Sequence, residues 1–175
     1  MSVLKKIMIG LFTIILVVMG FISYSRYQSA QELKMAFKND DKIQVLYHLM
    51  ASERYAKDIR QAGFTIPPDS AIRFDGAIDP LEIEGDLHLK ISPPGEESTE
   101  IWLFFSTEID GQEMDAVYTL DDKLQLQDSN YYQLNGEGTN ERVNISESEE
   151  KRLLSIVQKE INGFLDTMEE TLYNQ

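Results

Sequence analysis

The chain opens with a long uninterrupted run of hydrophobic side chains. Residues Ile7 to Tyr24 include no charged side chain. With the apolar residues that precede Lys5 and Lys6, the run reaches the ~20 residues with which a helix crosses roughly 30 Å of hydrocarbon. The two lysines can extend to one headgroup layer, and Tyr24 and Tyr27 suit the opposite interface. The pattern therefore predicts one transmembrane helix through residues 7–24.

The residues on either side of this run predict its orientation in the membrane and whether it is cleaved. A cleaved signal peptide needs small residues before the cut, but bulky Tyr24, Arg26 and Tyr27 stand there, which favours an uncleaved signal anchor. The basic pair precedes the run, so the positive-inside bias places the N-terminus in the cytoplasm. We expect residues 1–27 to form a cytoplasmic tip and anchor, and residues 28–175 to form one extracytoplasmic domain of a single-pass cell-membrane protein.

Helical signals follow the anchor. Gln28 to Lys38 has helical propensity and can continue the membrane helix outward as a short stalk. Asp40 or Asp41 can cap a second helix that reaches about Ala62, and Gly63 stands where a left-handed C-terminal residue is expected. The apolar stripe of that second helix consists of Ile43, Leu46, Leu49 and Met50.

In the next part of the chain the period changes from helical spacing to two. Apolar and polar side chains alternate from Leu81 to Ile91, which predicts a single strand with one buried and one wet face. Ile101 to Ile109 is apolar on both faces at its start and is expected to be a central strand. Asp110-Gly111 suits a two-residue hairpin turn into Met114–Leu120, because both residues tolerate positive φ.

The rest of the chain predicts short strands and then a long helix. Asp121-Asp122 is a weaker turn before Lys123–Gln127, and Tyr131–Leu134 can add a last strand, giving a meander of four or five strands. Ser146 and Glu149 form a capping box. It precedes a helical stripe made of Leu153, Val157, Ile161, Phe164, Leu165, Met168 and Leu172. We expect an α+β fold, an antiparallel meander with flanking helices over one face and with the other face open.

One pair of aromatic residues in the central strand has two possible locations. Trp102 and Phe104 share the face opposite Leu103 and Phe105. One pair must face the core, and the other either meets a second layer of helix or is exposed as an interaction anchor. The pattern favours burial of both pairs.

The net charge of the chain limits the classes of partner that it can bind. The chain has 30 acidic and 16 basic residues and a net charge of -14, and without Lys5 and Lys6 the remainder carries 14 basic against 30 acidic side chains. Such an acidic domain repels phosphate backbones, so we expect no nucleic-acid binding. Excess acid either keeps a domain soluble and monomeric or attracts a basic protein, and both interpretations stay open. The absence of cysteine excludes disulfides and Cys-ligated zinc.

No pattern of residues indicates catalysis. His48 and His88 are far apart in sequence and show no metal or triad spacing, and the common nucleotide-binding, hydrolase and zinc motifs are absent. Glu82, Glu84 and Asp86 alternate on the predicted strand, where they form either a solvated face or a partner-binding row. We therefore expect no enzyme, no metal and no cofactor.

The order of anchor, short helices, acidic meander and terminal helix resembles the TipC family of immunity proteins. So does the strand-turn-strand run from Phe104 to Tyr118 (FFSTEIDGQEMDAVY). The resemblance implies a protein held on the outer surface of Gram-positive cells that neutralises a cognate LXG-type toxin. It implies a mechanism without chemistry, in which the open sheet face covers a secreted toxin and carboxylates steer its basic surface.

The residues that we expect to bind such a partner are polar groups of the meander: Glu82, Glu84, Asp86, His88, Glu108 and Asp115. A sensory or assembly domain of a cell-envelope complex would share the anchor, the acidity and the lack of catalytic residues. A hydrolase that uses the strand carboxylates is a third possibility.

Overall fold

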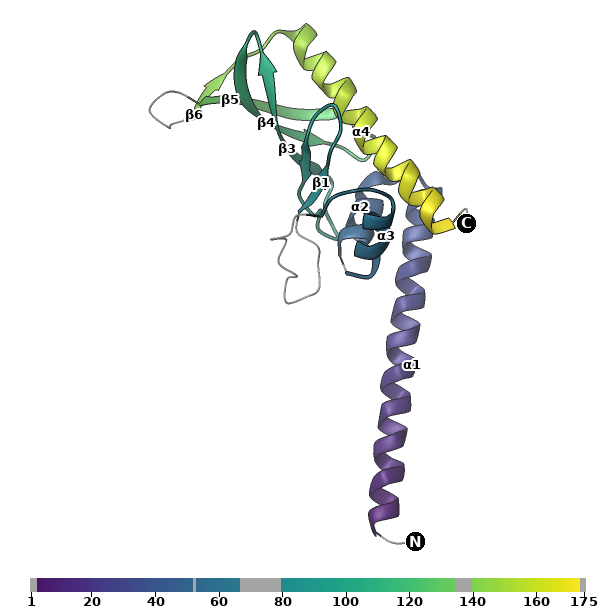
Figure 1. Ribbon diagram of the computed structural model, residues 1–175. Coiled ribbons are helices and arrows are strands. Elements are labelled where there is room, and N and C mark those ends of the chain that lie inside the picture. Colours follow the sequence, from purple (N-terminus) through teal and green to yellow (C-terminus); the bar gives the residue numbers. More distant parts are fainter. Residues whose placement is uncertain (1–2, 52, 67–79, 135–139, 174–175) are drawn as a thin grey trace.

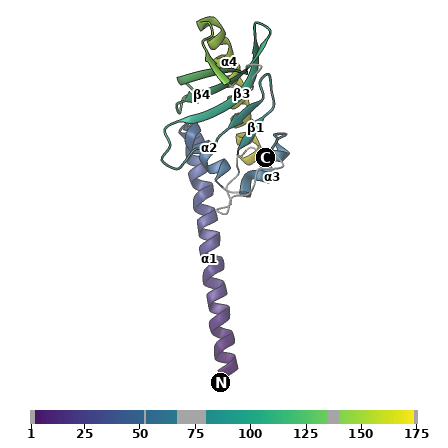
Figure 2. The same ribbon diagram turned by 90° about the vertical axis from the view of Figure 1, so that its left-hand side faces the viewer.

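A single long helix carries the rest of the molecule at its C-terminal end (Figure 1). The structure, a computed structural model, describes residues 3–51, 53–66, 80–134 and 140–173. Helix α1 (Val3–Lys38) runs without a break, so the predicted helical continuation over residues 28–38 is confirmed. Its apolar part is exposed, and the helix is long and apolar enough to cross a membrane. Both views show it projecting from the globular part (Figure 2).

The last turns of α1 belong to the core of the globular part. Leu33 and Ala36 are buried, and the ring of Phe37 meets the ring of Tyr173 edge-on at 5.8 Å between centroids. The same helix is therefore an exposed apolar rod at one end and a packed core element at the other.

The predicted second helix is broken, contrary to expectation. Helix α2 (Lys42–Met50) is capped by Asp41, whose carboxylate accepts the Gln44 backbone N–H at 3.0 Å. It is followed by a short 3₁₀ helix η1 (Glu53–Tyr55) and by helix α3 (Ala56–Gln61). A continuous helix would carry the apolar stripe of α2 onto charged residues at positions 53, 54 and 57. The break instead brings other side chains into the core: Tyr55, Ala56 and Ile59.

The sheet is an antiparallel meander of six strands in chain order. The strands are β1 (Leu81–Ile83), β2 (Leu89–Ile91), β3 (Ile101–Ile109), β4 (Gln112–Leu120), β5 (Leu126–Leu134) and β6 (Asn140–Val143). Helix α4 (Glu147–Tyr173) crosses one face of this sheet, and the predicted α+β meander with flanking helices is confirmed (Figure 1). The core lies between that face, α4, α2, α3 and the end of α1.

The predicted single strand from Leu81 to Ile91 is wrong. The segment folds back on itself as the hairpin β1–β2, in which Leu81 pairs with Ile91 and Glu82 with Lys90. Both arms bury their apolar residues, so the alternation in the sequence survives the reversal. The connecting residues 84–88 include Gly85, which packs so close to α4 that a Cβ atom there would collide with the Glu160 carboxylate.

The remaining strands follow the predicted turns with two differences. Asp110 and Gly111 have φ values of 53° and 77°, which confirms the two-residue turn between β3 and β4. In place of the predicted strands Lys123–Gln127 and Tyr131–Leu134 there is one strand, β5, which runs unbroken from Leu126 to Leu134. It begins later than predicted, because Leu124 adopts a left-handed φ of 57° and extends the preceding turn. Strand β6 is additional.

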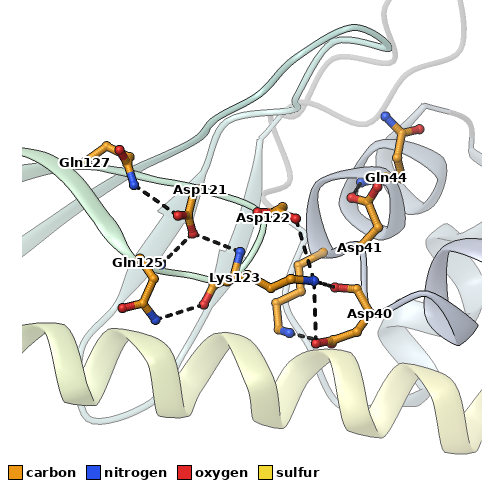
Figure 3. Close-up of polar contacts among 9 residues, drawn as sticks. Asp40, Asp41, Gln44, Asp121, Asp122, Lys123, Gln125 and Gln127 are labelled. Atoms are coloured by element: carbon orange, nitrogen blue, oxygen red, sulfur yellow. Dashed lines mark hydrogen bonds and ion pairs between the residues drawn. The ribbon is translucent and has the colours of Figure 1, made fainter.

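The turn between β4 and β5 is connected to the corner between α1 and α2 (Figure 3). The Asp121 carboxylate accepts the backbone N–H groups of Lys123 at 2.9 Å and Gln125 at 2.8 Å. The Lys123 ammonium group then donates a hydrogen bond to the Asp40 carbonyl oxygen at 3.0 Å. This network fixes the sheet relative to the end of α1.

Helix α4 closes the buried face of the sheet as predicted. Ser146 accepts the Glu149 backbone N–H at 3.2 Å, the first half of the predicted capping box. The predicted stripe from Leu153 to Met168 is buried, and Leu172 packs partly against the core. No element of the described residues covers the opposite face of the sheet.

Candidate protein-binding face

Strand β3 carries two different faces. Its odd-numbered residues from Ile101 to Ile109 are buried toward α4, whereas its even-numbered residues are exposed. Trp102 is 48% exposed and Phe104 is 39% exposed. The expectation that both pairs of apolar side chains are buried is therefore wrong, because no second layer of described residues covers this side. We call the uncovered side of the sheet the open face.

Strand register assembles the open face from side chains far apart in sequence. Phe104 lies between Lys90 of β2 and Val117 of β4. In the adjacent row, Ser106 pairs with Asp115. That row continues to β5 and β6 through Tyr132 and Arg142. A hollow of about 610 Å³ lies over these rows and is lined by Phe104, Val117, Asp115, Tyr132, Glu82 and His88.

Polar contacts hold the charged groups of the open face in place. The Glu82 carboxylate lies 3.4 Å from His88 Nε2 and 3.6 Å from Lys90 Nζ. Ser106 donates its hydroxyl to Asp115 at 2.7 Å. The Trp102 indole N–H donates to the Glu100 carboxylate at 3.2 Å, which leaves the ring itself on the surface. Each accessible aromatic ring thus has a carboxylate nearby: Glu100 at Trp102, and Glu82 and Asp115 at the hollow that Phe104 lines.

The structure brings four of the six predicted partner-binding residues to this face. Glu82, His88 and Asp115 line the hollow. Glu108 is exposed on the same side of β3, opposite Glu113 of β4.

The other two predicted residues lie elsewhere. Glu84 and Asp86 are in the β1–β2 connection, and Asp86 pairs with Lys159 of α4 at 2.6 Å. The expected row of three carboxylates on one strand is wrong, because the hairpin turns Asp86 toward the helix.

Sequence reasoning missed several contributors to the open face. Lys90, Val117, Tyr132 and Arg142 join it through the pairing register of consecutive strands of the meander. The sequence did indicate that Trp102 and Phe104 share a face, since residues two apart on a strand do so.

The face has the chemistry of a contact surface. Among the residues that the structure describes, no group of three His, Asp or Glu side chains is arranged to hold a metal ion. His48 lines a different hollow, between α1 and α2. No residue that lines this second hollow also lines the hollow of the open face. Burial lowers the pKa of His48, while Glu32, Glu96 and Asp41 oppose that shift. The arrangement on the open face can bury apolar rings and pair cations from a partner.

Comparison with protein-family models, with curated proteins and with solved structures finds no match to this chain.

Proposed function

We propose that this chain is a membrane-tethered binding protein that neutralises a secreted toxin by covering it with the open face, as an immunity protein. The single observation that carries the proposal is the exposure of Trp102 and Phe104 on a central strand whose other face is buried. Large aromatic side chains on a rigid, uncovered surface are typical anchors of protein interfaces.

The charge of the sheet and α4 suits a basic partner. Residues 81–175 contain 22 acidic and six basic side chains. Glu82 and Asp115 place part of this charge at the hollow that Phe104 lines, and Glu108 adds charge farther along the same face of β3. Complementary charge raises the association rate and loses that effect as salt is added.

The long helix supplies the tether. The pair Lys5 and Lys6 precedes the apolar run, which favours a cytoplasmic N-terminus and an extracytoplasmic globular part. A toxin that acts outside the cell would then meet the open face near the membrane before it reaches its target. The resemblance to the TipC family adds support for this class of partner.

A sensory or assembly domain of a cell-envelope complex is the second candidate. The observation that favours it is the continuity of α1, which carries Leu33 of the core on the same helix as the apolar run. A rigid helix could transmit a change in the globular part toward the bilayer. Gene neighbourhood separates the two functions: an adjacent LXG toxin gene favours immunity, and cell-division or secretion neighbours favour assembly.

The test is protection of living cells. If an LXG toxin is encoded beside this chain, cells that export that toxin should survive when the full chain is expressed in the membrane. The double substitution Trp102→Ala/Phe104→Ala should abolish protection and weaken binding by roughly 1,000-fold, since two interface aromatics at ~2 kcal/mol each are removed.

Met35→Ala is the matched control, because Met35 is also an exposed apolar residue but lies on α1. It should leave protection unchanged. Protection by the double variant, at equal membrane abundance and equal melting temperature, would refute the open face as the binding site. Failure of the unchanged chain to protect would refute the immunity role.

A further inference from the structure

Charge is divided sharply along the molecule. Residues 26–62 contain seven basic and five acidic side chains, whereas residues 81–175 contain six basic and 22 acidic ones. The first segment comprises the end of α1 together with α2, η1 and α3. The strong acidity of the chain therefore belongs to the sheet and α4, and the helical base of the globular part is weakly basic.

The helical base lies close to the end of the apolar run. Arg54 of η1 donates a hydrogen bond to the Arg26 backbone carbonyl at 2.6 Å. Arg26 follows Tyr24 by two residues, which is roughly 3 Å along a helix. If residues 7–24 cross the hydrocarbon, this contact holds η1 at the level of the lipid headgroups.

Helix α3 follows η1 directly and lies on the side of the globular part nearer the N-terminal end of α1. Figures 1 and 2 agree on this height, because the second view is turned about the vertical axis. Lys57 and Arg60 of α3 are exposed, and neither side chain forms an ion pair with another residue that the structure describes. Two cations are thus available at the height where Arg54 meets α1.

We propose that η1 and α3 form a membrane-contact surface, in which Lys57 and Arg60 bind anionic phospholipid headgroups. This inference rests on the proposed membrane anchoring and goes beyond the proposed toxin binding. A basic side chain near an anionic membrane surface strengthens contact by about fivefold. The acidic sheet and α4 are repelled by the same surface, so contact at the base and repulsion of the rest together turn the open face outward.

The experiment measures contact between α3 and lipid in the full chain. The chain has no cysteine, so Gln61→Cys at the exposed end of α3 gives a single site for a fluorophore. The labelled protein is reconstituted in vesicles of phosphatidylcholine alone or with roughly one third phosphatidylglycerol, each doped with a headgroup spin-labelled quencher lipid. We expect stronger quenching in the anionic vesicles, and loss of the increase at high salt.

Lys57→Gln/Arg60→Gln should lower the contact equilibrium in anionic vesicles by about 25-fold, so that quenching falls to its level in neutral vesicles. Lys151→Gln/Arg152→Gln removes the same charge from the first turns of α4, and should leave quenching unchanged. Equal quenching in both lipid mixtures, or quenching insensitive to the α3 substitutions, would overturn the contact surface.

Flotation of the vesicles in alkaline carbonate distinguishes failure of this inference from failure of the anchor. Chain that floats with the vesicles but shows no lipid-dependent quenching is anchored without the proposed contact. Chain that is released from the vesicles would overturn the anchor and the contact surface together.

Discussion

The two faces of β3 are built from the same nine residues and experience opposite surroundings. Toward α4, alternate side chains from Ile101 to Ile109 are buried in the same core as the apolar stripe of the helix. On the other side, Trp102 and Phe104 leave large parts of their rings in solvent. Apolar residues alone therefore do not identify the core side of this strand.

The two faces of the sheet differ in whether a helix covers them. The buried face receives α4, whose stripe extends over more than four turns from Leu153 to Met168. The open face receives no helix from the described part of the chain. Burying a large side chain stabilises a fold by roughly 1.5–3 kcal/mol, so exposed aromatics forgo stabilisation unless a partner covers them. The face that contributes less to folding is the one available for binding.

Substitutions at two adjacent residues of β3 give the largest expected difference between its two faces. Leu103→Ala opens a cavity in the buried face and should lower the free energy of unfolding by about 3 kcal/mol. Phe104→Ala removes a larger side chain from the open face and should lower it by less than about 1 kcal/mol. Urea unfolding of the detergent-solubilised full chain measures both. Similar losses for the two variants would show that the open face is covered.

The sequence predicted those parts of the fold that depend on local signals. The Asp110-Gly111 turn, the Ser146 cap and the stripe of α4 depend on residues close in the chain, and all three occur as expected. The break after Met50 was not predicted, because the stripe of α2 has helical spacing up to Met50 and does not itself mark the end of the helix. The stripe would continue at positions 53, 54 and 57, which are charged, so the helix has to end before them.

The β1–β2 hairpin and the open face were beyond local reasoning for a different reason. A continuous strand and a hairpin with an odd number of connecting residues produce the same alternation, so Leu81 to Ile91 fits both. Asp86 could not be placed until its distant partner Lys159 was known. Tyr132 and Arg142 join the open face only through strand register, a property of pairs of segments.

The buried face of the sheet includes one polar pair of aromatic residues. Tyr118 and Tyr131 share a hydrogen bond of 2.5 Å between their hydroxyl groups, and both rings are buried. Burial raises the pKa of Tyr131 to about 12 and raises that of Tyr118 as well. The folded chain thus favours the neutral phenols, and their contribution to stability is complete below the ordinary tyrosine pKa near 10.

As pH rises above about 10, the unfolded chain loses phenolic protons first and the folded state loses stability. The loss should approach about 1.4 kcal/mol per pH unit for each tyrosine, until Tyr131 titrates near its raised pKa. Urea unfolding at successive alkaline pH values measures the slope. Tyr131→Phe should reduce the slope by about one proton; an unchanged slope would show that this pair does not titrate as described.

The smallest expected effect is on the open face, where Glu82 pairs with Lys90 and His88. The distance between Glu82 and Lys90 is 3.6 Å, and the lysine is exposed, so solvent screens the attraction. A double-mutant cycle with Glu82→Gln and Lys90→Gln should give a coupling free energy of about 0.2–1 kcal/mol, as for other exposed ion pairs. The coupling should shrink further in high salt. A coupling above about 2 kcal/mol would mean that the pair is shielded from water. The face around it would then be part of the core and not an exposed surface.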